Sequence, residues 1–231
     1  MGTDIEFSVF SLVPPGMDDR LIACLFNSFT PDKATAEKSL QAIHESRPAN
    51  PLMELVCVGT TIDAEVELQA PEQFNGTRQH TTGFWIKDDA DVASVMERMM
   101  VDCKSKETVC SWTSTDRLAA RLVSDHSTEN LANTCMSSHY GALYTVWHSQ
   151  DEDQKYMSHH NGIMKEVHRH SVGGCLGDSD FQSFETKYWG NAAGRKLMEL
   201  RKKWDPKGRI CGYLDSGDKS GIIGLENKIV L

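Results

Sequence analysis

The chain has 231 residues, of which 39% are hydrophobic and 25% charged, and this composition is that of an ordinary folded protein. Its formal net charge of -9 repels polyanions, and the basic cluster at residues 195–203 is explained by the end of a predicted helix, so nucleic acid is not an expected partner. The sequence lacks a signal peptide and an apolar run of membrane-spanning length, which predicts a cytoplasmic protein with no membrane partner.

The cysteines and histidines do not indicate a metal site or a disulfide framework. There are seven cysteines, an odd number, none in a Cys-x-x-Cys spacing and most within apolar runs, so we expect reduced core residues. His159-His160 and His168-Arg-His170 have no convergent acidic or thiol companions in sequence. We therefore predict that no metal is bound.

The first half of the chain reads as strands with one helix between them. Apolar runs predict strands over residues 5–13 and 21–29, and Thr30-Pro31-Asp32 then predicts the start of a helix. Clean alternation of apolar and acidic residues over 62–68 predicts a strand with one wet face, and 81–86 predicts another short strand.

The second half continues with helices and strands in turn. Asp88-Asp89 opens a predicted helix, and strands are predicted over 108–114 and 139–148, whereas 117–133 has no firm period. A long helix is predicted from residue 151, with Tyr156, His160, Ile163 and Val167 on one face and a glycine turn at Gly173-Gly174 as its end. The fold class expected from this order is α+β: an antiparallel β-sheet with helices packed on one face, followed by a helical C-terminal segment.

The most particular stretch lies near the end of the sequence. Tyr188-Trp189-Gly190 precedes a helix predicted over 191–203, which Asn191 could cap and which Pro206 stops. The order aromatic-aromatic-Gly, then Leu-x-x-Leu-Arg-Lys-Lys-Trp-Asp-Pro-x-Gly, resembles the C-terminal segment of the berberine bridge enzyme-like FAD-linked oxidoreductases. The glycine-containing stretch 173–181 and the strand at 139–148 agree with this resemblance in kind and order.

The resemblance implies a division of the chain and a cofactor. Residues 1–171 would be a substrate-binding-like α+β domain, and residues 172–231 the C-terminal berberine bridge enzyme-like segment. The family implies FAD, but the sequence contains no glycine-rich strand-to-helix turn for a pyrophosphate, so we expect the FAD-binding domain to be absent. The expected cofactor is therefore FAD held with help from elsewhere, or none.

The candidate site residues come partly from the strands and partly from the resemblance. Aromatic side chains of the strands are expected to line a substrate pocket: Trp112, Tyr144 and Trp147. The catalytic candidates are His139, His148 and Asp178, and Asp178 and Asp180 are also candidates for contact with the flavin or, alternatively, for capping a turn. Where the family usually has a tyrosine near the flavin, this chain has Cys175-Leu-Gly-Asp178, which argues against a phenol base at that point.

Three functions remain open from the sequence. The first is an FAD-linked oxidoreductase-type protein that acts on a small, largely apolar, secondary-metabolite-like substrate and is truncated, without its own flavin domain. The second is a flavin-independent cyclase or isomerase that uses the retained substrate pocket. The third is a non-catalytic remnant or half of a split oxidase. Because roughly 600 to 1,500 Å² of interdomain surface would otherwise be uncovered, we also expect a protein partner or a second copy on that face.

Overall fold

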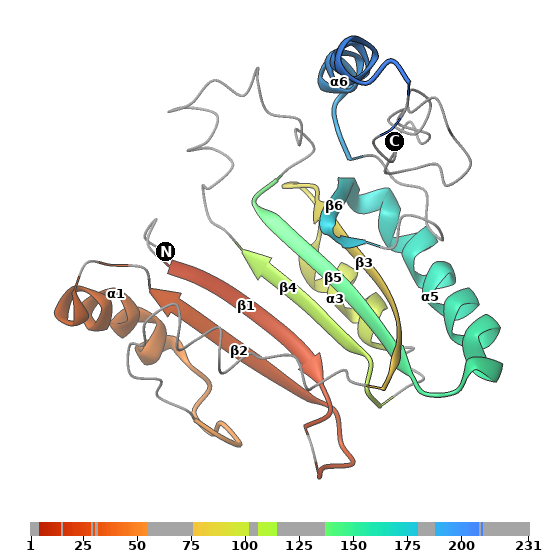
Figure 1. Ribbon diagram of the computed structural model, residues 1–231. Helices are drawn as coiled ribbons and strands as arrows, with labels where there is room; N and C mark the ends of the chain where they lie inside the picture. The colour runs from red at the N-terminus through yellow and green to blue at the C-terminus, as the bar shows by residue number, and fades with distance from the viewer. Residues whose placement is uncertain are drawn as a thin grey trace.

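The centre of the molecule is a six-stranded antiparallel sheet. The computed structural model describes residues 5–14, 16–28, 30, 32–54, 76–101, 106–114, 137–179, 188–207 and 209. The strands lie in the order β2-β1-β4-β5-β3-β6, and every neighbouring pair is antiparallel (Figure 1). Their bounds are β1 (Ile5–Leu12), β2 (Leu21–Ser28), β3 (Arg78–Ile86), β4 (Val109–Ser114), β5 (His139–Trp147) and β6 (Ser171–Ser179).

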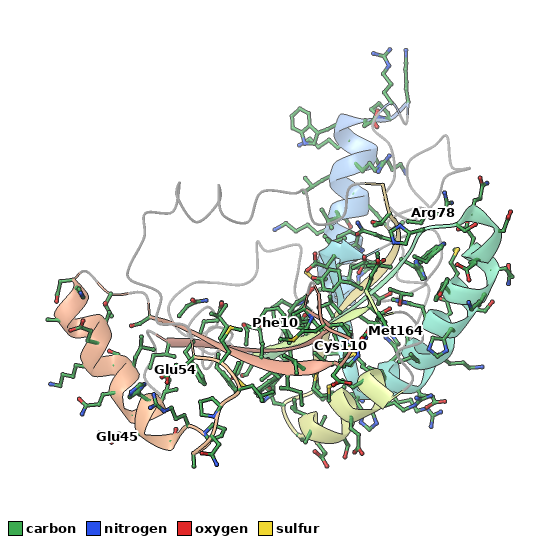
Figure 2. All side chains as sticks on the ribbon, turned by 90° about the horizontal axis from the view of Figure 1, so that it is seen from below. Phe10, Glu45, Glu54, Arg78, Cys110 and Met164 are labelled. Atoms are coloured by element: carbon green, nitrogen blue, oxygen red, sulfur yellow. The ribbon has the colours of Figure 1, made fainter. Side chains whose placement is uncertain are left out.

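The helices that pack on the sheet cover one of its faces. The helical elements are α1 (Lys33–Ser46), α3 (Val92–Val101), α5 (Asp153–Val167) and α6 (Asn191–Trp204), with short 3₁₀ turns at Gln150–Glu152 and His168–His170. Helices α3 and α5 contact each other and strands β3, β4 and β5. Figure 2 shows the sheet nearly edge-on, with α3 below it and α6 above. The predicted α+β class, with an antiparallel sheet and helices on one face, is confirmed.

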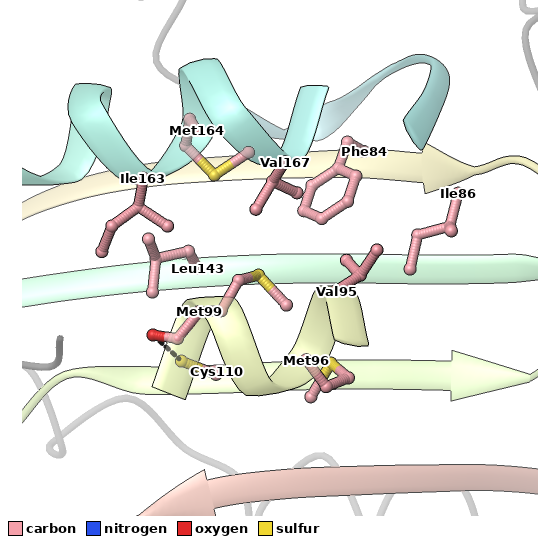
Figure 3. Close-up of a cluster of buried hydrophobic side chains, with 10 residues drawn as sticks. All are labelled: Phe84, Ile86, Val95, Met96, Met99, Cys110, Leu143, Ile163, Met164 and Val167. Carbon is pink, nitrogen blue, oxygen red and sulfur yellow. Dashed lines mark hydrogen bonds between the residues drawn. The ribbon is translucent and has the colours of Figure 1, made fainter. Parts of the chain in front are cut away.

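The hydrophobic core fills the space between the sheet and helices α3 and α5. Phe84, Leu143 and Met164 have no exposed surface, and they come from β3, β5 and α5. The thiol of Cys110 lies 3.4 Å from the carbonyl oxygen of Met99, as Figure 3 shows, and is buried as the sequence predicted. The same prediction is wrong for Cys24, which is exposed on an outer strand of the sheet. Since burying one such apolar side chain stabilises a fold by about 1.5–3 kcal/mol, this cluster is what holds the two helices on the sheet.

Strand alternation divides the central strand β5 into two faces. Leu143 packs in the core, and Thr145 contacts His160 of α5, so the odd-numbered side chains point toward the helices. Successive side chains of a strand point to opposite faces. Tyr140 and Tyr144 therefore lie on the other face, which we call the open face because α3 and α5 do not cover it.

Most predicted elements that fall on described residues are present. The inner face predicted for the long helix is confirmed, since Tyr156, His160, Ile163 and Val167 are all buried in α5. The strand predicted over 62–68 and the undecided region 117–133 lie outside the described residues.

Two predictions about element ends are wrong. Gly173 and Gly174 are not a turn that ends the long helix: they lie inside β6 and pair with Trp85 and Phe84. The helix instead ends at Val167 and passes through a 3₁₀ turn, and glycines suit a strand that runs against two bulky aromatic residues. The N-cap of α6 is Gly190, so Asn191 is its first helical residue rather than its cap.

The predicted division at residues 171 and 172 coincides with the first residues of β6, a strand of the sheet, and the division itself stays a prediction. In the part of the chain that the structure describes, no helix is both long and apolar enough to span a bilayer. Among the same residues, no three His, Cys, Asp or Glu side chains are grouped as metal ligands would be.

Candidate active site

Two tyrosines and one aspartate meet on the open face of the sheet. Tyr140 and Tyr144 come from β5, and Asp178 comes from β6, on the far side of β3. The phenol hydroxyl of Tyr140 donates a hydrogen bond to Oδ2 of Asp178. Tyr144 also interacts with both Tyr140 and Asp178. The three side chains therefore form one hydrogen-bonded group, which we call the Tyr140–Asp178 site.

The electrostatics of the site keep both phenols protonated at neutral pH. Burial raises the pKa of Tyr140 far above its usual value, and the hydrogen bond to Asp178 raises it further. Burial likewise raises the pKa of Tyr144, and the negative charge of Asp178 adds to this. The site thus holds two neutral hydroxyl groups beside one carboxylate, an arrangement that can pass a proton from a bound donor through a phenol to the carboxylate.

Aromatic and sulfur groups surround the site. The Trp85 ring lies 5.3 Å from the Tyr140 ring, centroid to centroid. The half-buried Cys175 lies on the same strand as Asp178, three residues before it. The sequence argued against a phenol at the position of Cys175 and Asp178, and the structure shows that β5, on the other side of β3 from β6, brings one to Asp178.

The predicted site residues divide between the two faces of the sheet. Tyr144 and Asp178 lie together in the Tyr140–Asp178 site. Trp112 packs against the core on the helix-covered face, and His139 lies beside it with ring centroids 5.8 Å apart. Trp147 stacks on Tyr156 of α5, with ring centroids 5.5 Å apart. Trp112, His139 and Trp147 therefore do not share a pocket with Tyr144. Their roles as substrate-binding or catalytic groups stay predictions.

His148 lies just beyond the end of β5, away from Asp178. Its side chain is 66% exposed, and Nε2 is 2.8 Å from a carboxylate oxygen of Glu107. It lines an open depression of about 310 Å³, together with Trp147 and Tyr156. Its catalytic role, too, stays a prediction. Asp180, the second flavin-contact candidate, lies outside the described residues.

Sequence reasoning missed Tyr140, although the signal was present. Tyr140 and Tyr144 are four residues apart in β5, and every second side chain of a strand lies on the same face of the sheet. A pocket drawn from β5 should therefore have paired Tyr140 with Tyr144, instead of Trp147 or His139. The link to Asp178 required the position of β6, which was hidden while Gly173-Gly174 was interpreted as a turn.

The starts of α1, α3 and α5 do not suit a dinucleotide pyrophosphate. Such a group binds free backbone N–H groups at a helix N-terminus. The Asp32 carboxylate accepts the backbone N–H of Thr35 at α1, and that of Asp91 accepts the N–H of Ser94 at α3. Asp153 opens α5. These carboxylates would repel a phosphate, so the starts of α1, α3 and α5 do not fit the FAD that the sequence resemblance implies.

Comparison with curated proteins identifies relatives over nearly the whole chain. No protein-family profile matches it. It is 22% identical over 214 residues to the FAD-linked oxidoreductase nodO of Hypoxylon pulicicidum, and the match covers 93% of this chain and 47% of nodO. It is 24% identical over 213 residues to penO of Penicillium crustosum, covering 92% of this chain and 46% of penO. The chain thus spans about half the length of the curated relatives it matches.

Solved flavoenzymes share the fold. The flavoenzyme CrmK of caerulomycin biosynthesis matches with a TM-score of 0.65 at 13% identity, over 88% of this chain and 45% of CrmK. The Physcomitrella patens berberine bridge enzyme-like protein 1 matches with a TM-score of 0.60 at 12% identity, over 94% of this chain and 47% of that protein. The resemblance to the berberine bridge enzyme-like FAD-linked oxidoreductases, predicted from the sequence, is confirmed.

Proposed function

We propose that this chain is the substrate-handling half of an FAD-linked oxidoreductase, in which the Tyr140–Asp178 site removes a proton from a small, largely apolar, secondary-metabolite-like substrate. The observation that carries the proposal is the hydrogen bond from the Tyr140 hydroxyl to Asp178 on the open face. The similarity to FAD-linked oxidoreductases over 92–93% of the chain supports the reaction class.

The proton is moved by Asp178 and Tyr140 together. A substrate hydroxyl or amine donates its hydrogen bond to the Tyr140 oxygen, whose own proton already points at Asp178. As the substrate loses its proton to the phenol oxygen, the phenol proton passes to the carboxylate. Tyr140 is therefore a relay and Asp178 the final base. Tyr144 donates a further hydrogen bond, and its raised pKa keeps it in the donating, neutral form.

The open face favours an uncharged or cationic substrate over an anionic one. By strand alternation, its described positions on β1, β3, β4 and β5 include no lysine, arginine or histidine. Beside the site they are small hydroxyl residues, such as Ser8 and Thr113, whose oxygens lie 2.9 Å apart. The half-buried rings of Tyr140 and Tyr144 supply apolar surface. A small, mostly apolar molecule with one hydroxyl or amine fits this lining.

The flavin would have to be held elsewhere. Because α1, α3 and α5 start with acidic residues, these three helix starts do not provide a pyrophosphate site, and we derive no step on the flavin from them. The relatives are about twice as long as this chain. We propose that a second FAD-holding half, either on the same polypeptide or as a protein partner, covers the open face and carries the oxidant.

Isolation of the protein from its native cells tests the proposal. A tagged copy should purify with stoichiometric FAD, detected by the visible absorption of an oxidised flavin and by its fluorescence after denaturation. Small molecules from the same cells should bleach that absorption, and Asp178→Asn should retain the flavin but lose the bleaching. A colourless, flavin-free protein would refute the proposal. An aggregated preparation without flavin would favour a non-catalytic remnant.

The second candidate is a flavin-independent cyclase or isomerase. Its specific support is that the acid–base group is complete within this chain, since Tyr140, Tyr144 and Asp178 need no redox cofactor to move a proton. A colourless, monodisperse protein that converts a substrate to an isomer, and loses this activity in Asp178→Asn, would favour it over the oxidoreductase.

A further inference from the structure

We propose that Gly83, together with the bulge of β6 that lies over it, is the positioning device that brings Asp178 onto the Tyr140 hydroxyl. This inference rests on the proposed function, because it assigns the part of the fold that builds the proposed proton-transfer site. It concerns β3, a strand that contributes no side chain to the hydrogen-bonded group itself.

Gly83 lies directly beneath the Tyr140–Asp178 contact. A Cβ atom at residue 83 would overlap with the Tyr140 hydroxyl oxygen, and it would lie 2.8 Å from Cβ of Asp178 and 3.2 Å from the Asp178 carbonyl oxygen. Non-bonded carbon atoms are optimally about 3.5–4.0 Å apart. The phenol and the aspartate can therefore meet only while residue 83 has no side chain.

The backbone of β6 is displaced at this same point. Thr82 pairs with Ser179 and Phe84 pairs with Gly174, so two residue steps along β3 face five steps along β6. The Ser179 hydroxyl donates to the carbonyl oxygen of Cys175 at 2.8 Å and lies 3.3 Å from that of Gly83. The extra residues, Asp178 among them, are thus fastened over Gly83. Bulges of this kind commonly re-aim a side chain beside a functional site.

Space, and not backbone conformation, is the reason for a glycine here. Among the described residues, the glycines with a positive φ are Gly16 and Gly76, and both lie outside this region of the sheet. A glycine inside a strand weakens that strand, and it often marks a place where another group approaches closely. At residue 83 the approaching groups are the two that the proposed reaction uses.

The neighbouring strand offers a matched control. A Cβ atom at Gly141 of β5 would lie 2.9 Å from Cζ of Phe84 and 3.3 Å from Cδ1 of Ile86, which are core atoms on the helix-covered face. Gly83→Ala and Gly141→Ala therefore add the same methyl group at similarly tight positions on adjacent strands. Only the first places it against Tyr140 and Asp178.

The test is NMR of the chain with ¹³C at Cζ of its tyrosines, with the Tyr140 signal assigned from Tyr140→Phe. This signal reports the hydrogen bond to the carboxylate. We expect it to move in Gly83→Ala toward its position in Asp178→Asn, and to stay in place in Gly141→Ala. A Tyr140 signal unchanged by Gly83→Ala would overturn the inference, as would equal shifts in both alanine variants.

Stability measurements keep the test decisive if Gly83→Ala folds poorly. Tyr140→Phe removes the oxygen that the new methyl group would overlap, so Gly83→Ala should lower the urea midpoint less in the Tyr140→Phe background than in the unchanged chain. An equal loss in both backgrounds would contradict the proposed geometry.

Activity separates this inference from the proposed function. In the flavin-loaded protein, Gly83→Ala should lower kcat about tenfold or more with a smaller effect on KM, because a misplaced acid–base pair still allows binding. If the Tyr140 signal moves as expected while kcat is unchanged, the positioning role holds and the proposed function of the site is wrong.

Discussion

His160, which is buried between α5 and the sheet, should make the fold lose stability in mild acid. Its ring has no exposed surface, and its two nitrogens each lie 2.8 Å from a hydroxyl oxygen, Nε2 from Thr82 and Nδ1 from Thr145. The His80 ring is 4.2 Å away, centroid to centroid. Burial, followed by the nearby His80 and His159, lowers the pKa of His160 to about 2. The experiment lowers the pH and compares the stability of the unchanged chain with that of a variant that lacks the His160 imidazole.

The magnitude follows from the difference between the folded and the unfolded pKa. An unfolded histidine titrates near pH 6.5, so below that pH the unfolded chain binds a proton that folded His160 refuses. The stabilisation is therefore complete above about pH 6.5 and is lost as the pH falls toward about 2. The loss is about 1.4 kcal/mol per pH unit, or about 2–3 kcal/mol between pH 6.5 and 4.5. Since a domain's net stability is about 5–15 kcal/mol, this loss is easily measured.

Urea unfolding at pH 7.0, 6.5, 5.5 and 4.5 measures the effect. His160→Gln keeps a hydrogen-bonding side chain but does not titrate. Between pH 6.5 and 4.5 its free energy of unfolding should therefore fall by about 2–3 kcal/mol less than that of the unchanged chain. His168, whose pKa burial also lowers, contributes to both curves alike. His148→Gln, at a histidine that is 66% exposed, is the matched control and should follow the unchanged chain. Parallel curves for His160→Gln and the unchanged chain would show that His160 does not cause the loss of stability in acid.

Three further outcomes follow from the structure. Leu143→Ala, in the core, should lower the free energy of unfolding by about 2–5 kcal/mol in urea titrations, whereas Trp204→Ala, at a side chain 75% exposed, should change it by about 0.5 kcal/mol or less. Tyr144→Phe should reduce turnover of the flavin-loaded protein while the Tyr140 NMR signal remains near its original position, and full activity would contradict a donor role for Tyr144. Asp91→Ala should destabilise α3 by about 1 kcal/mol through loss of its hydrogen bond to the Ser94 N–H, measured by urea unfolding, and an unchanged midpoint would contradict it.

The part of the fold that the sequence predicted well is the part with strong periodicity. The buried positions of α5 repeat at helical spacing, and β5 is a long run of apolar and aromatic residues, so local pattern and tertiary burial agree. The C-terminal helix was also visible, because Leu197 and Leu200 recur before Pro206. Only its cap was assigned wrongly, since Gly190 and not Asn191 serves as the N-cap.

The position of β6 could not be predicted, because glycines give contradictory local signals. Gly173 and Gly174 indicate a turn when considered alone, and only the bulky Trp85 and Phe84 on the neighbouring strand explain why glycines suit a strand here. This error also concealed the register shift of β6 over Gly83. A site that depends on such a shift arises from pairing between distant strands, which a single sequence does not encode locally.

The candidate site was half predicted for the same reason. Tyr144 and Asp178 were selected, and alternation within β5 was sufficient to add Tyr140. The same alternation assigns His139 and Trp147 to the helix-covered face, where they contact Trp112 and Tyr156. The predicted pocket was chosen from the aromatic residues of the strands, without asking on which face of the sheet each side chain lies.

A crystal structure of the flavin-loaded protein would show on which face of the sheet the flavin ring lies. We expect the isoalloxazine ring to lie against the open face, next to Tyr140, Tyr144 and Asp178, with room for a small substrate between them. A ring bound on the face that α3 and α5 cover, or far from the Tyr140 hydroxyl, would contradict this expectation.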